Sequence, residues 1–323
     1  MGQYSIGIDL GGTNLKGVLM DRKGEIRHLS RQPTEASKGG AQVLQNILEL
    51  VDQIIGKEGS QSEIIGVGIG TPGFVDGDGM ILGGAENLPG WRGTQVYAPI
   101  KERFGLSAAA SNDVTVAALA EANFGAGRGI ANVVMLALGT GVGGGIVINH
   151  RIYQGTHGMA GELGHIVVES NGLKCSCGQL GCIESYASGT GIVKNAQIAC
   201  AQSSDYSATP FVKFVNKNPD QVTAKIVYDY VKQGDYVAVA VNDFVGERLA
   251  RAVGIILNSL APDRIILGGG VMNDNLFLLD SVKKHTPRFC WDSIWRRCEI
   301  VPAECGENAG VLGAAALAFD QLA

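Results

Sequence analysis

The feature that most constrains the fold of this chain is a pattern that occurs twice: an apolar run, a glycine-rich turn and a second apolar run. The first copy joins Tyr4–Leu10 to Leu15–Met20, and the second joins Asn132–Leu138 to Ile146–Ile148. Short apolar runs on either side of a glycine turn are typical of β-hairpins. Because the same pattern recurs, the sequence predicts a duplicated α/β architecture.

The first turn carries groups suited to binding a polyphosphate. The N–H groups of Gly11 and Gly12 can approach phosphate closely, the Thr13 hydroxyl adds a donor, and Asp9 can hold a hydrated Mg²⁺. A plain hairpin turn is the alternative interpretation. A third glycine turn, at 268–270, follows another apolar run and would let a nucleoside pass close to the backbone.

Two common nucleotide-binding motifs do not fit the residues around these glycines. Residues 12–17 resemble half of a P-loop, but Val18 follows where that motif requires Lys and then Ser or Thr. Gly139, Gly141 and Gly144 satisfy the G-x-G-x-x-G spacing of a dinucleotide fold, but a strand and not a helix is predicted after them. The sequence therefore favours a second phosphate-binding hairpin.

The periodicity of apolar residues indicates the other main elements. A buried strand is predicted at 64–70, and helices at 41–55, 114–124, 222–231, 235–260 and 308–322. The apolar side of the helix at 235–260 is expected to contain Val239, Phe244, Leu249, Val253, Ile256 and Leu257.

Several polar groups follow these elements at places where ligands bind in open α/β sheets. Gly73 ends the breaker Thr71-Pro72-Gly73 after a strand and exposes backbone groups there. Asn112 and Asp113 directly precede a helix. Asp113 either caps that helix or accepts a proton from a substrate hydroxyl.

The loop from Glu86 to Trp91 combines polar and aromatic residues. Such a loop suits the hydroxyls and the apolar face of a sugar, and Asn87 is its candidate ligand. Simple packing of the tryptophan is the alternative.

The segment from Gly161 to Glu184 is the strongest local signal in the sequence. It contains the candidate metal ligands His165, Cys175, Cys177 and Cys182. Three thiols and one imidazole suit tetrahedral Zn²⁺, and four protein ligands leave no position for a reacting water, so we expect a structural ion. The alternative is that the cysteines are free thiols that only pack in the protein interior. The ion would fix Glu162 and Glu184.

Length and composition exclude several classes of protein. A chain of 323 residues exceeds the usual size of one core, so two domains with a cleft between them are expected. The formal net charge of −5 offers no general attraction to nucleic acid or to anionic membranes. Without a signal peptide or a long apolar run, we expect a cytoplasmic protein. Seven cysteines in a reducing compartment indicate metal ligands more than disulfides.

Taken together, these motifs resemble those of the ROK family of sugar kinases over nearly the whole chain. The matching motifs are DLGGT at 9–13, TPG at 71–73, ND at 112–113, LGTGVGGG at 138–145, GELGH at 161–165, CSCGQLGCIE at 175–184 and LGGG at 267–270. The resemblance implies an actin-like ATPase fold of two ribonuclease-H-like α/β domains with a cleft active site. We expect a small domain at 1–113, completed by a C-terminal helix at 305–323, and a large domain with the zinc loop at 114–304.

The resemblance also implies a role for each matching residue. Asp113 becomes the general base. The sugar ligands become Gly73, Asn87, Asn112, Asp113, Glu162, His165 and Glu184. The groups around ATP and Mg²⁺ become Asp9, Gly11, Gly12, Thr13, Lys16, Thr140, Gly141 and Gly269. Because the phosphate turns lie elsewhere in the sequence, loss of zinc is expected to weaken sugar binding more than ATP binding.

Glucose, phosphorylated at O6 by ATP, is the substrate that the GELGH and NLPGW motifs favour by resemblance. Kinases of fructose, allose or N-acetylmannosamine share most of these motifs and remain alternatives. A sugar sensor without catalysis is a further alternative, which the presence of Asp113 disfavours. A sugar-responsive repressor is disfavoured because the first strand is expected to begin by Tyr4, which leaves no room for a helix-turn-helix domain. The family resemblance implies a homodimer or homotetramer.

Overall fold

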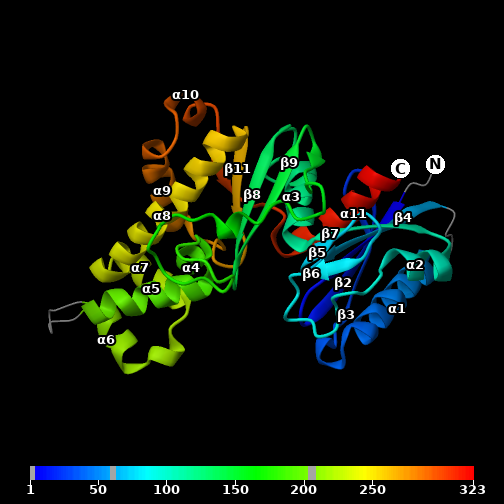
Figure 1. Ribbon diagram of the computed structural model, residues 1–323, viewed down its shortest axis with the longest axis horizontal. Coiled ribbons are helices and arrows are strands. Elements are labelled where there is room, and N and C mark those ends of the chain that lie inside the picture. The colour runs from blue at the N-terminus through cyan, green and yellow to red at the C-terminus, as the bar shows by residue number, and fades with distance from the viewer. Residues whose placement is uncertain (1–3, 59–62, 203–208) are drawn as a thin grey trace. The chain divides into compact units, whose positions relative to one another are not determined.

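The computed structural model describes residues 4–58, 63–202 and 209–323, and the chain divides into two compact units (Figure 1). Unit 1 comprises Met1–Val133, Gly145–Gly161 and Glu304–Ala323, and unit 2 comprises Val134–Gly144 and Glu162–Ala303. The chain therefore passes from one unit to the other after residues 133, 144, 161 and 303.

The strands and helices of unit 1 alternate along the chain. They are β1 (Tyr4–Leu10), β2 (Asn14–Asp21), β3 (Ile26–Pro33), α1 (Gly40–Glu58), β4 (Ile64–Thr71), β5 (Phe74–Val75), β6 (Ile81–Gly83), α2 (Tyr97–Phe104), β7 (Ser107–Asn112), α3 (Asp113–Phe124), β10 (Arg151–Ile152) and α11 (Ala309–Leu322). Unit 2 is mostly helical. Its elements are α4 (Glu184–Ala187), α5 (Gly189–Gln202), α6 (Pro210–Lys217), α7 (Ala224–Lys232), α8 (Tyr236–Leu260), β11 (Arg264–Gly268), α9 (Leu276–His285), α10 (Asp292–Trp295) and β12 (Glu299–Pro302). The boundary between the units crosses β8 (Val133–Leu138) and β9 (Val142–Ile148).

The first sheet has the strand order β3-β2-β1-β4-β7. β1 and β2 form the predicted antiparallel hairpin, in which Asp9 lies opposite Lys16. β4 is parallel to both β1 and β7. The carboxyl ends of these three parallel strands therefore meet at one edge of the sheet, where ligands bind in open α/β folds.

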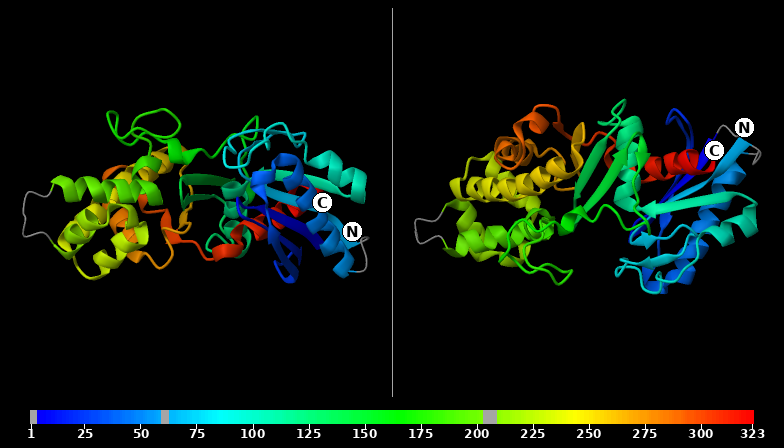
Figure 2. Two further views of the ribbon diagram at one scale, coloured as in Figure 1. Left: turned by 90° about the horizontal axis from the view of Figure 1, so that it is seen from below. Right: turned by 45° about the horizontal axis from the view of Figure 1, so that its top comes forward.

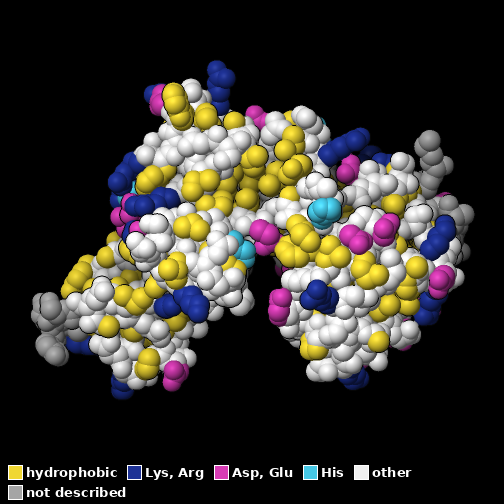
Figure 3. Space-filling model, in the orientation of Figure 1, with side chains coloured by type: hydrophobic (Ala, Val, Ile, Leu, Met, Phe, Trp, Pro, Cys, Tyr) yellow, Lys and Arg dark blue, Asp and Glu magenta, His cyan; other side chains and the backbone are white. Residues whose placement is uncertain are grey.

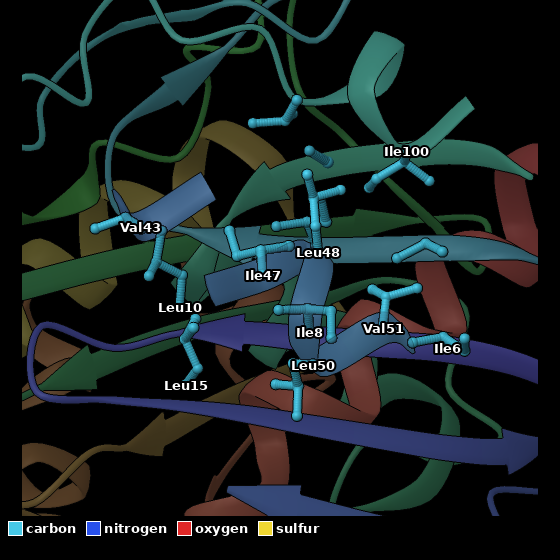
Figure 4. Packing of buried hydrophobic residues seen from close by; sticks show 14 of the residues in the cluster. Ile6, Ile8, Leu10, Leu15, Val43, Ile47, Leu48, Leu50, Val51 and Ile100 are labelled. Carbon is cyan, nitrogen blue, oxygen red and sulfur yellow. The ribbon is translucent and has the colours of Figure 1, made fainter. Parts of the chain in front are cut away.

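Each face of this sheet is covered by a pair of helices because apolar side chains alternate along the strands. Ile6, Ile8 and Leu10 of β1 point to one face and pack against buried residues of α1, as Figure 4 shows. Val18 and Met20 of β2 point to the other face and belong to the cluster formed with α3 and α11. The predicted helix at 41–55 is thus confirmed as a core element.

Helix α11 returns from the far end of the chain to lie against the first sheet, as the two views of Figure 2 show in red. Two glycines permit this close approach. A Cβ added at Gly68 of β4 would lie 1.7 Å from the Ala314 carbonyl oxygen, and one at Gly313 would lie 1.7 Å from that of Val116. The close packing of α11 on β4 and on α3 therefore requires glycine at both positions.

Replacing Gly68 with Ala should destabilise unit 1 by more than about 2 kcal/mol, because the methyl group would push backbone away from backbone. The matched control is Gly56→Ala, at an exposed position of α1 where an added Cβ meets nothing within 4 Å. That change should stabilise the protein by about 0.5–1 kcal/mol. Thermal unfolding of both variants gives the comparison. An unchanged midpoint for Gly68→Ala would contradict the packing described above.

The second sheet has the strand order β10-β9-β8-β11-β12. The second glycine turn is shorter than the sequence indicates, because β9 begins at Val142 and includes Gly143, Gly144 and Gly145. Gly145 is required for packing, since an added Cβ would lie 2.5 Å from that of Ala118. The strand after Gly141 agrees with the exclusion of a dinucleotide-binding motif, which needs a helix there.

Four helices of unit 2, α6, α7, α8 and α9, begin at side chains that accept hydrogen bonds from their first turns. Asp235 accepts from the N–H groups of Val237 and Ala238 and so starts α8. Two residues predicted for the buried side of this helix, Val239 and Phe244, are instead 41% and 36% exposed. That prediction is wrong because neighbouring helices cover only part of its circumference. None of the described helices has the length and apolarity that crossing a bilayer requires.

Unit 1 extends beyond the domain boundary predicted after residue 113. It includes α3 and β10, which the sequence assigned to the large domain, and the segment to residue 133. The physical reason is packing: Val116 and Leu119 of α3 share an apolar cluster with Val311 of α11.

Candidate functional site

The first group of candidate residues lies at the carboxyl edge of the first sheet. Asp9 of β1 is paired with Gly70 of β4, and Thr71 of β4 is paired with Asn112 of β7. This register brings Asp9, the Thr71–Gly73 turn and Asn112 to the same edge, although they are far apart in the sequence.

Asn112, and not Asp113, is the cap of helix α3. Its side-chain oxygen accepts from the N–H groups of Val114 and Thr115 at 2.9 and 3.4 Å. Its amide nitrogen lies 3.5 Å from the Gly73 carbonyl oxygen. Asp113 is the first residue of the helix, and one of its oxygens accepts from Val114 N–H at 2.9 Å. The prediction that Asp113 caps the helix is therefore wrong, because Asn112 does so.

The carboxyl group of Asp113 has the electrostatics of a general base. Burial raises its pKa to about 6, and the negative charge of Asp9 adds to the rise, while the hydrogen bond from Val114 opposes it. A base works best when its pKa lies near the working pH. Burial also raises the pKa of Asp9, with the positive charge of Lys16 opposing.

The pKa of Asp113 predicts how activity depends on pH. Only the deprotonated carboxylate can accept a proton, so kcat/KM should fall about tenfold per pH unit below about pH 6 and level off above it. Initial rates between pH 5 and 8 test this. A profile that stays flat down to pH 5 would exclude Asp113 as the titrating base.

The turn between β1 and β2 is held in shape by its own backbone and by Thr34. Gly11 N–H donates to the Asn14 carbonyl oxygen at 3.1 Å. Thr34 N–H donates to the Thr13 carbonyl oxygen at 2.9 Å, and the Thr34 hydroxyl donates to the Gly11 carbonyl oxygen at 2.5 Å. These bonds fix the candidate phosphate turn in advance of any ligand.

Two further predicted residues lie beside this turn. The Asn87 side-chain nitrogen is the nearest atom to a Cβ added at Gly12, at 3.3 Å. Asn87 thus lies over the candidate phosphate turn, although the sequence assigned it to the sugar. The Lys16 ammonium group donates to the Glu307 carbonyl oxygen at 2.5 Å and lies 3.8 Å from the carboxylate of that residue.

Trp91 does not present its ring to a ligand. It is fully buried, and its indole N–H donates to the Thr71 hydroxyl oxygen at 2.9 Å. Trp91 therefore supports the end of β4 from inside the core, in agreement with the alternative interpretation that it packs in the protein interior.

The candidate metal ligands of unit 2 come together in space. The ligand atoms of His165, Cys175, Cys177 and Cys182 all lie within 4.8 Å of one another. The Cys175 sulfur is 3.7 Å from His165 Nδ1, and the Cys177 sulfur is 3.7 Å from that of Cys182. Thiolates about 2.3 Å from a tetrahedral Zn²⁺ lie about 3.8 Å apart. The donor set and its spacing therefore fit this ion.

The two ring nitrogens of His165 face different groups. Its Nδ1 faces the sulfur cluster, whereas its Nε2 lies 3.8 Å from a carboxylate oxygen of Glu162. Burial raises the pKa of Glu162, the charge of Glu184 adds to the rise, and His165 opposes it. A histidine that binds metal through one nitrogen is left with an oriented N–H on the other.

Glu184 connects the sulfur cluster to the second glycine turn. One of its oxygens accepts from the Ser176 hydroxyl at 3.0 Å and lies 3.5 Å from the Cys175 sulfur. The other accepts from Val142 N–H at 3.1 Å. A Cβ at Gly141 would lie 2.5 Å from that oxygen, so a side chain at this position would displace the Glu184 carboxylate.

A cavity of about 940 Å³ lies beside the same turn, within unit 2. Predicted Thr140 lines it, and so does Gly270, the neighbour of predicted Gly269. Gly269 itself adopts φ 85° and packs against the backbone of Leu138. The volume is in the range of small-molecule and cofactor sites.

Sequence reasoning missed most of the residues that line this cavity. They include Thr190, Val193, Thr223, Tyr228, Asp229 and Asn275. These residues come from α5, from α7 and from the positions just before α7 and α9, and none belongs to a motif. A cavity between helices leaves no local pattern in the sequence that could have revealed it.

The molecular face in Figure 3 shows lysine and arginine side chains interspersed with acidic ones. No continuous basic patch covers the described residues on this face. This distribution agrees with the weak attraction for nucleic acid expected from the net charge.

Comparison with known proteins places these motifs in one family over almost the whole chain. A sequence model of the ROK family matches residues 5–321. A glucokinase of Halalkalibacterium halodurans is 36% identical over 313 residues, which are 96% of this chain and 93% of the relative.

Solved structures give the same result at the level of the fold. A ROK hexokinase from Thermus thermophilus matches with a TM-score of 0.83 and 26% identity, over 98% of both chains. A ROK family glucokinase from Streptomyces griseus, in complex with glucose and AMPPNP, matches with a TM-score of 0.76 and 31% identity, over 98% of this chain and 99% of that one. The predicted actin-like ATPase fold is thereby confirmed.

Proposed function

Because the chain belongs to the ROK family and is an ATP-dependent hexokinase, we propose that it transfers the γ-phosphoryl group of ATP to O6 of glucose. The observation that carries this proposal is the position of Asp113. Its carboxyl group lies at the edge of the first sheet, where burial and the nearby negative charge of Asp9 raise its pKa to about 6. The glucose and AMPPNP bound by the Streptomyces griseus relative support both substrates.

In the proposed reaction, Asp113 accepts the O6 proton as the hydroxyl oxygen attacks the γ-phosphorus. Asn112, next to it in the chain, orients the sugar. Glu162, His165 Nε2 and Glu184 bind sugar hydroxyls. Carboxylates and an oriented imidazole N–H suit hydroxyl groups because each hydroxyl can both donate and accept.

The glycine turns would hold the phosphates of ATP. The N–H groups of Gly12 and Gly141, with the Thr13 and Thr140 hydroxyls, supply donors, and Gly11, whose N–H bonds Asn14, shapes the first turn. Asp9 would hold Mg²⁺, which neutralises phosphate charge when it is bound. Phosphoryl transfer requires mainly alignment and charge neutralisation, so these groups contribute most of the rate.

Zn²⁺ would bind to His165, Cys175, Cys177 and Cys182 and supply structural order only. All four positions of a tetrahedral shell are then filled by protein, which leaves no water to activate. We propose that the ion holds Glu184 and the imidazole of His165 in the orientation that binds the sugar.

A panel of sugars tests the proposal directly. Glucose, fructose, allose, mannose and N-acetylmannosamine are assayed with ATP and Mg²⁺, and the product is analysed for the phosphorylated position. Glucose should give the highest kcat/KM, with phosphate at O6. Higher efficiency with another sugar would replace glucose as the substrate, and no turnover with any of them would refute the proposed function.

A further inference from the structure

Glu121 is a completely buried acidic residue that has no part in the proposed chemistry. It lies in α3 and has no exposed surface. One carboxylate oxygen accepts from Ala126 N–H at 2.9 Å, and the other from Cys305 N–H at 2.7 Å. Glu304 N–H lies 3.0 and 3.1 Å from the two oxygens. A buried carboxylate is costly unless such bonds satisfy it, so its retention calls for an explanation.

The donors to this carboxylate lie on two segments by which the chain connects the units. Ala126 belongs to the segment that leads from α3 to Val133, where the chain first leaves unit 1. Glu304 and Cys305 directly follow Ala303, where the chain finally returns. The Glu121 side chain thus connects the segment by which the chain first leaves unit 1 to the segment by which it last returns.

The packing around this junction is tight. A Cβ added at Gly125 would lie 2.2 Å from a carboxylate oxygen of Glu121 and 2.7 Å from the Cys305 sulfur. Gly125 and Gly127 both donate their N–H groups to the Glu121 carbonyl oxygen, at 3.1 and 2.9 Å. The backbone and the side chain of one residue therefore hold the same turn.

The helix that carries Glu121 also carries Asp113. The two residues are separated by about 12 Å of continuous α-helix, at about 1.5 Å per residue. Gly313 lets α11 lie directly on this helix, which keeps it in place on the first sheet. Any displacement of the connecting segments relative to Glu121 is therefore a displacement relative to Asp113.

We propose that Glu121 is a positioning residue for the reaction. It fastens both connecting segments to α3, so that Asp113 keeps a constant position relative to them. The inference rests on the proposed role of Asp113 as base. It predicts that loosening the junction lowers kcat more than it weakens sugar binding, because the rate depends more steeply on the alignment of the base than the hydrogen bonds that hold the sugar do.

A pair of substitutions at Cys305 tests the junction without touching Glu121. Cys305 has φ −71°, which proline adopts without strain, so Cys305→Pro removes one N–H donor. Cys305→Ala is the matched control, since it keeps the N–H and deletes only the thiol, which is a weak donor to the Glu121 carboxyl group. The proline variant should lose about tenfold in kcat, with the glucose Kd from calorimetry changing less than twofold. The alanine variant should retain the wild-type kcat.

Glu121→Gln tests the same junction from the other side. Its NH₂ group replaces an acceptor with a donor that faces backbone N–H groups, so kcat should again fall about tenfold. Hydrogen exchange at residues 126 and 304 should become faster in both Glu121→Gln and Cys305→Pro, and exchange at residue 305 should become faster in Glu121→Gln, since proline has no N–H. Equal kcat in Cys305→Pro and Cys305→Ala would overturn the proposal, as would a parallel loss of kcat and glucose affinity. If Glu121→Gln does not fold, the Cys305 pair decides alone.

The wild-type sugar panel separates this inference from the proposed function. An inactive wild-type protein would refute the function, whereas hydrogen exchange needs no substrate and still tests the junction. Unchanged exchange at residues 126 and 304 in both variants would refute the anchoring role whatever the activity.

Discussion

Replacing Asp113 with Asn should lower kcat with glucose by about 10²- to 10⁴-fold, the usual contribution of a positioned general base. The amide has the shape of the carboxyl group, and its oxygen can still accept the hydrogen bond from Val114 N–H, which the carboxylate receives at 2.9 Å. It cannot accept the O6 proton at neutral pH. Glucose affinity should therefore change only a few-fold, and the decline of kcat/KM below about pH 6 should disappear.

Steady-state kinetics beside calorimetric titration with glucose measures both effects. Asp21→Asn is a suitable control, because Asp21 accepts from the N–H groups of Lys23 and Glu25 in a turn of the same unit. That variant should keep the wild-type kcat. Near-normal turnover by Asp113→Asn would leave Asp113 with no role beyond the first turn of α3.

The second large effect is expected at the sulfur cluster. Cys177→Ser removes one thiolate of the proposed zinc shell at an exposed position, where no cavity is created. Metal content should fall from about one ion per chain, and unit 2 should unfold at a lower temperature, because the free energy of binding a structural ion is free energy of folding. The KM for glucose should rise about 10- to 100-fold, as expected for the loss of a hydrogen bond to a charged group.

The structure changes one part of the sequence-based expectation for this variant. The sequence predicts that sugar binding is weakened more than ATP binding, but Glu184 contacts both the sulfur cluster and Val142 N–H of the second glycine turn. The KM for ATP should therefore rise as well. Elemental analysis beside kinetics tests this, with Cys290→Ser as a control outside the cluster. A wild-type protein that lacks zinc and has a normal glucose KM would show that the cysteines only pack.

Elements with strong periodicity could be predicted from the sequence. The β1–β2 hairpin, α1 and α11 have the expected positions to within a few residues, because alternation and helical spacing determine which side is buried. The convergence of His165 with the three cysteines could also be predicted, because residues within one short segment restrict each other. These features are local, and local patterns are what a single sequence contains.

Features that depend on distant packing could not be predicted in the same way. Gly145 reads as part of a turn, yet it lies in a strand because α3 packs directly over it. Trp91 reads as a loop aromatic, yet it is in the core because Thr71 provides a partner for its N–H. Glu121 gives no signal at all, since its donors are backbone groups of Ala126 and of residues 304–305. In each case the partner is determined only once the fold has formed.

The position of α11 has a consequence for the order in which the protein is made. Gly7 and Gly68 leave a groove on the first sheet that the backbone of α11 fills, and this helix is the last element of the chain. Domains generally begin to fold during synthesis, from the N-terminus onward. Here the first sheet leaves the ribosome early with one apolar face covered by α3 alone, and it must wait for all of unit 2 before α11 completes the cover. A ribosome that stalls within unit 2 would therefore hold an exposed, aggregation-prone sheet, and chaperones that bind apolar surfaces would be needed most during that interval.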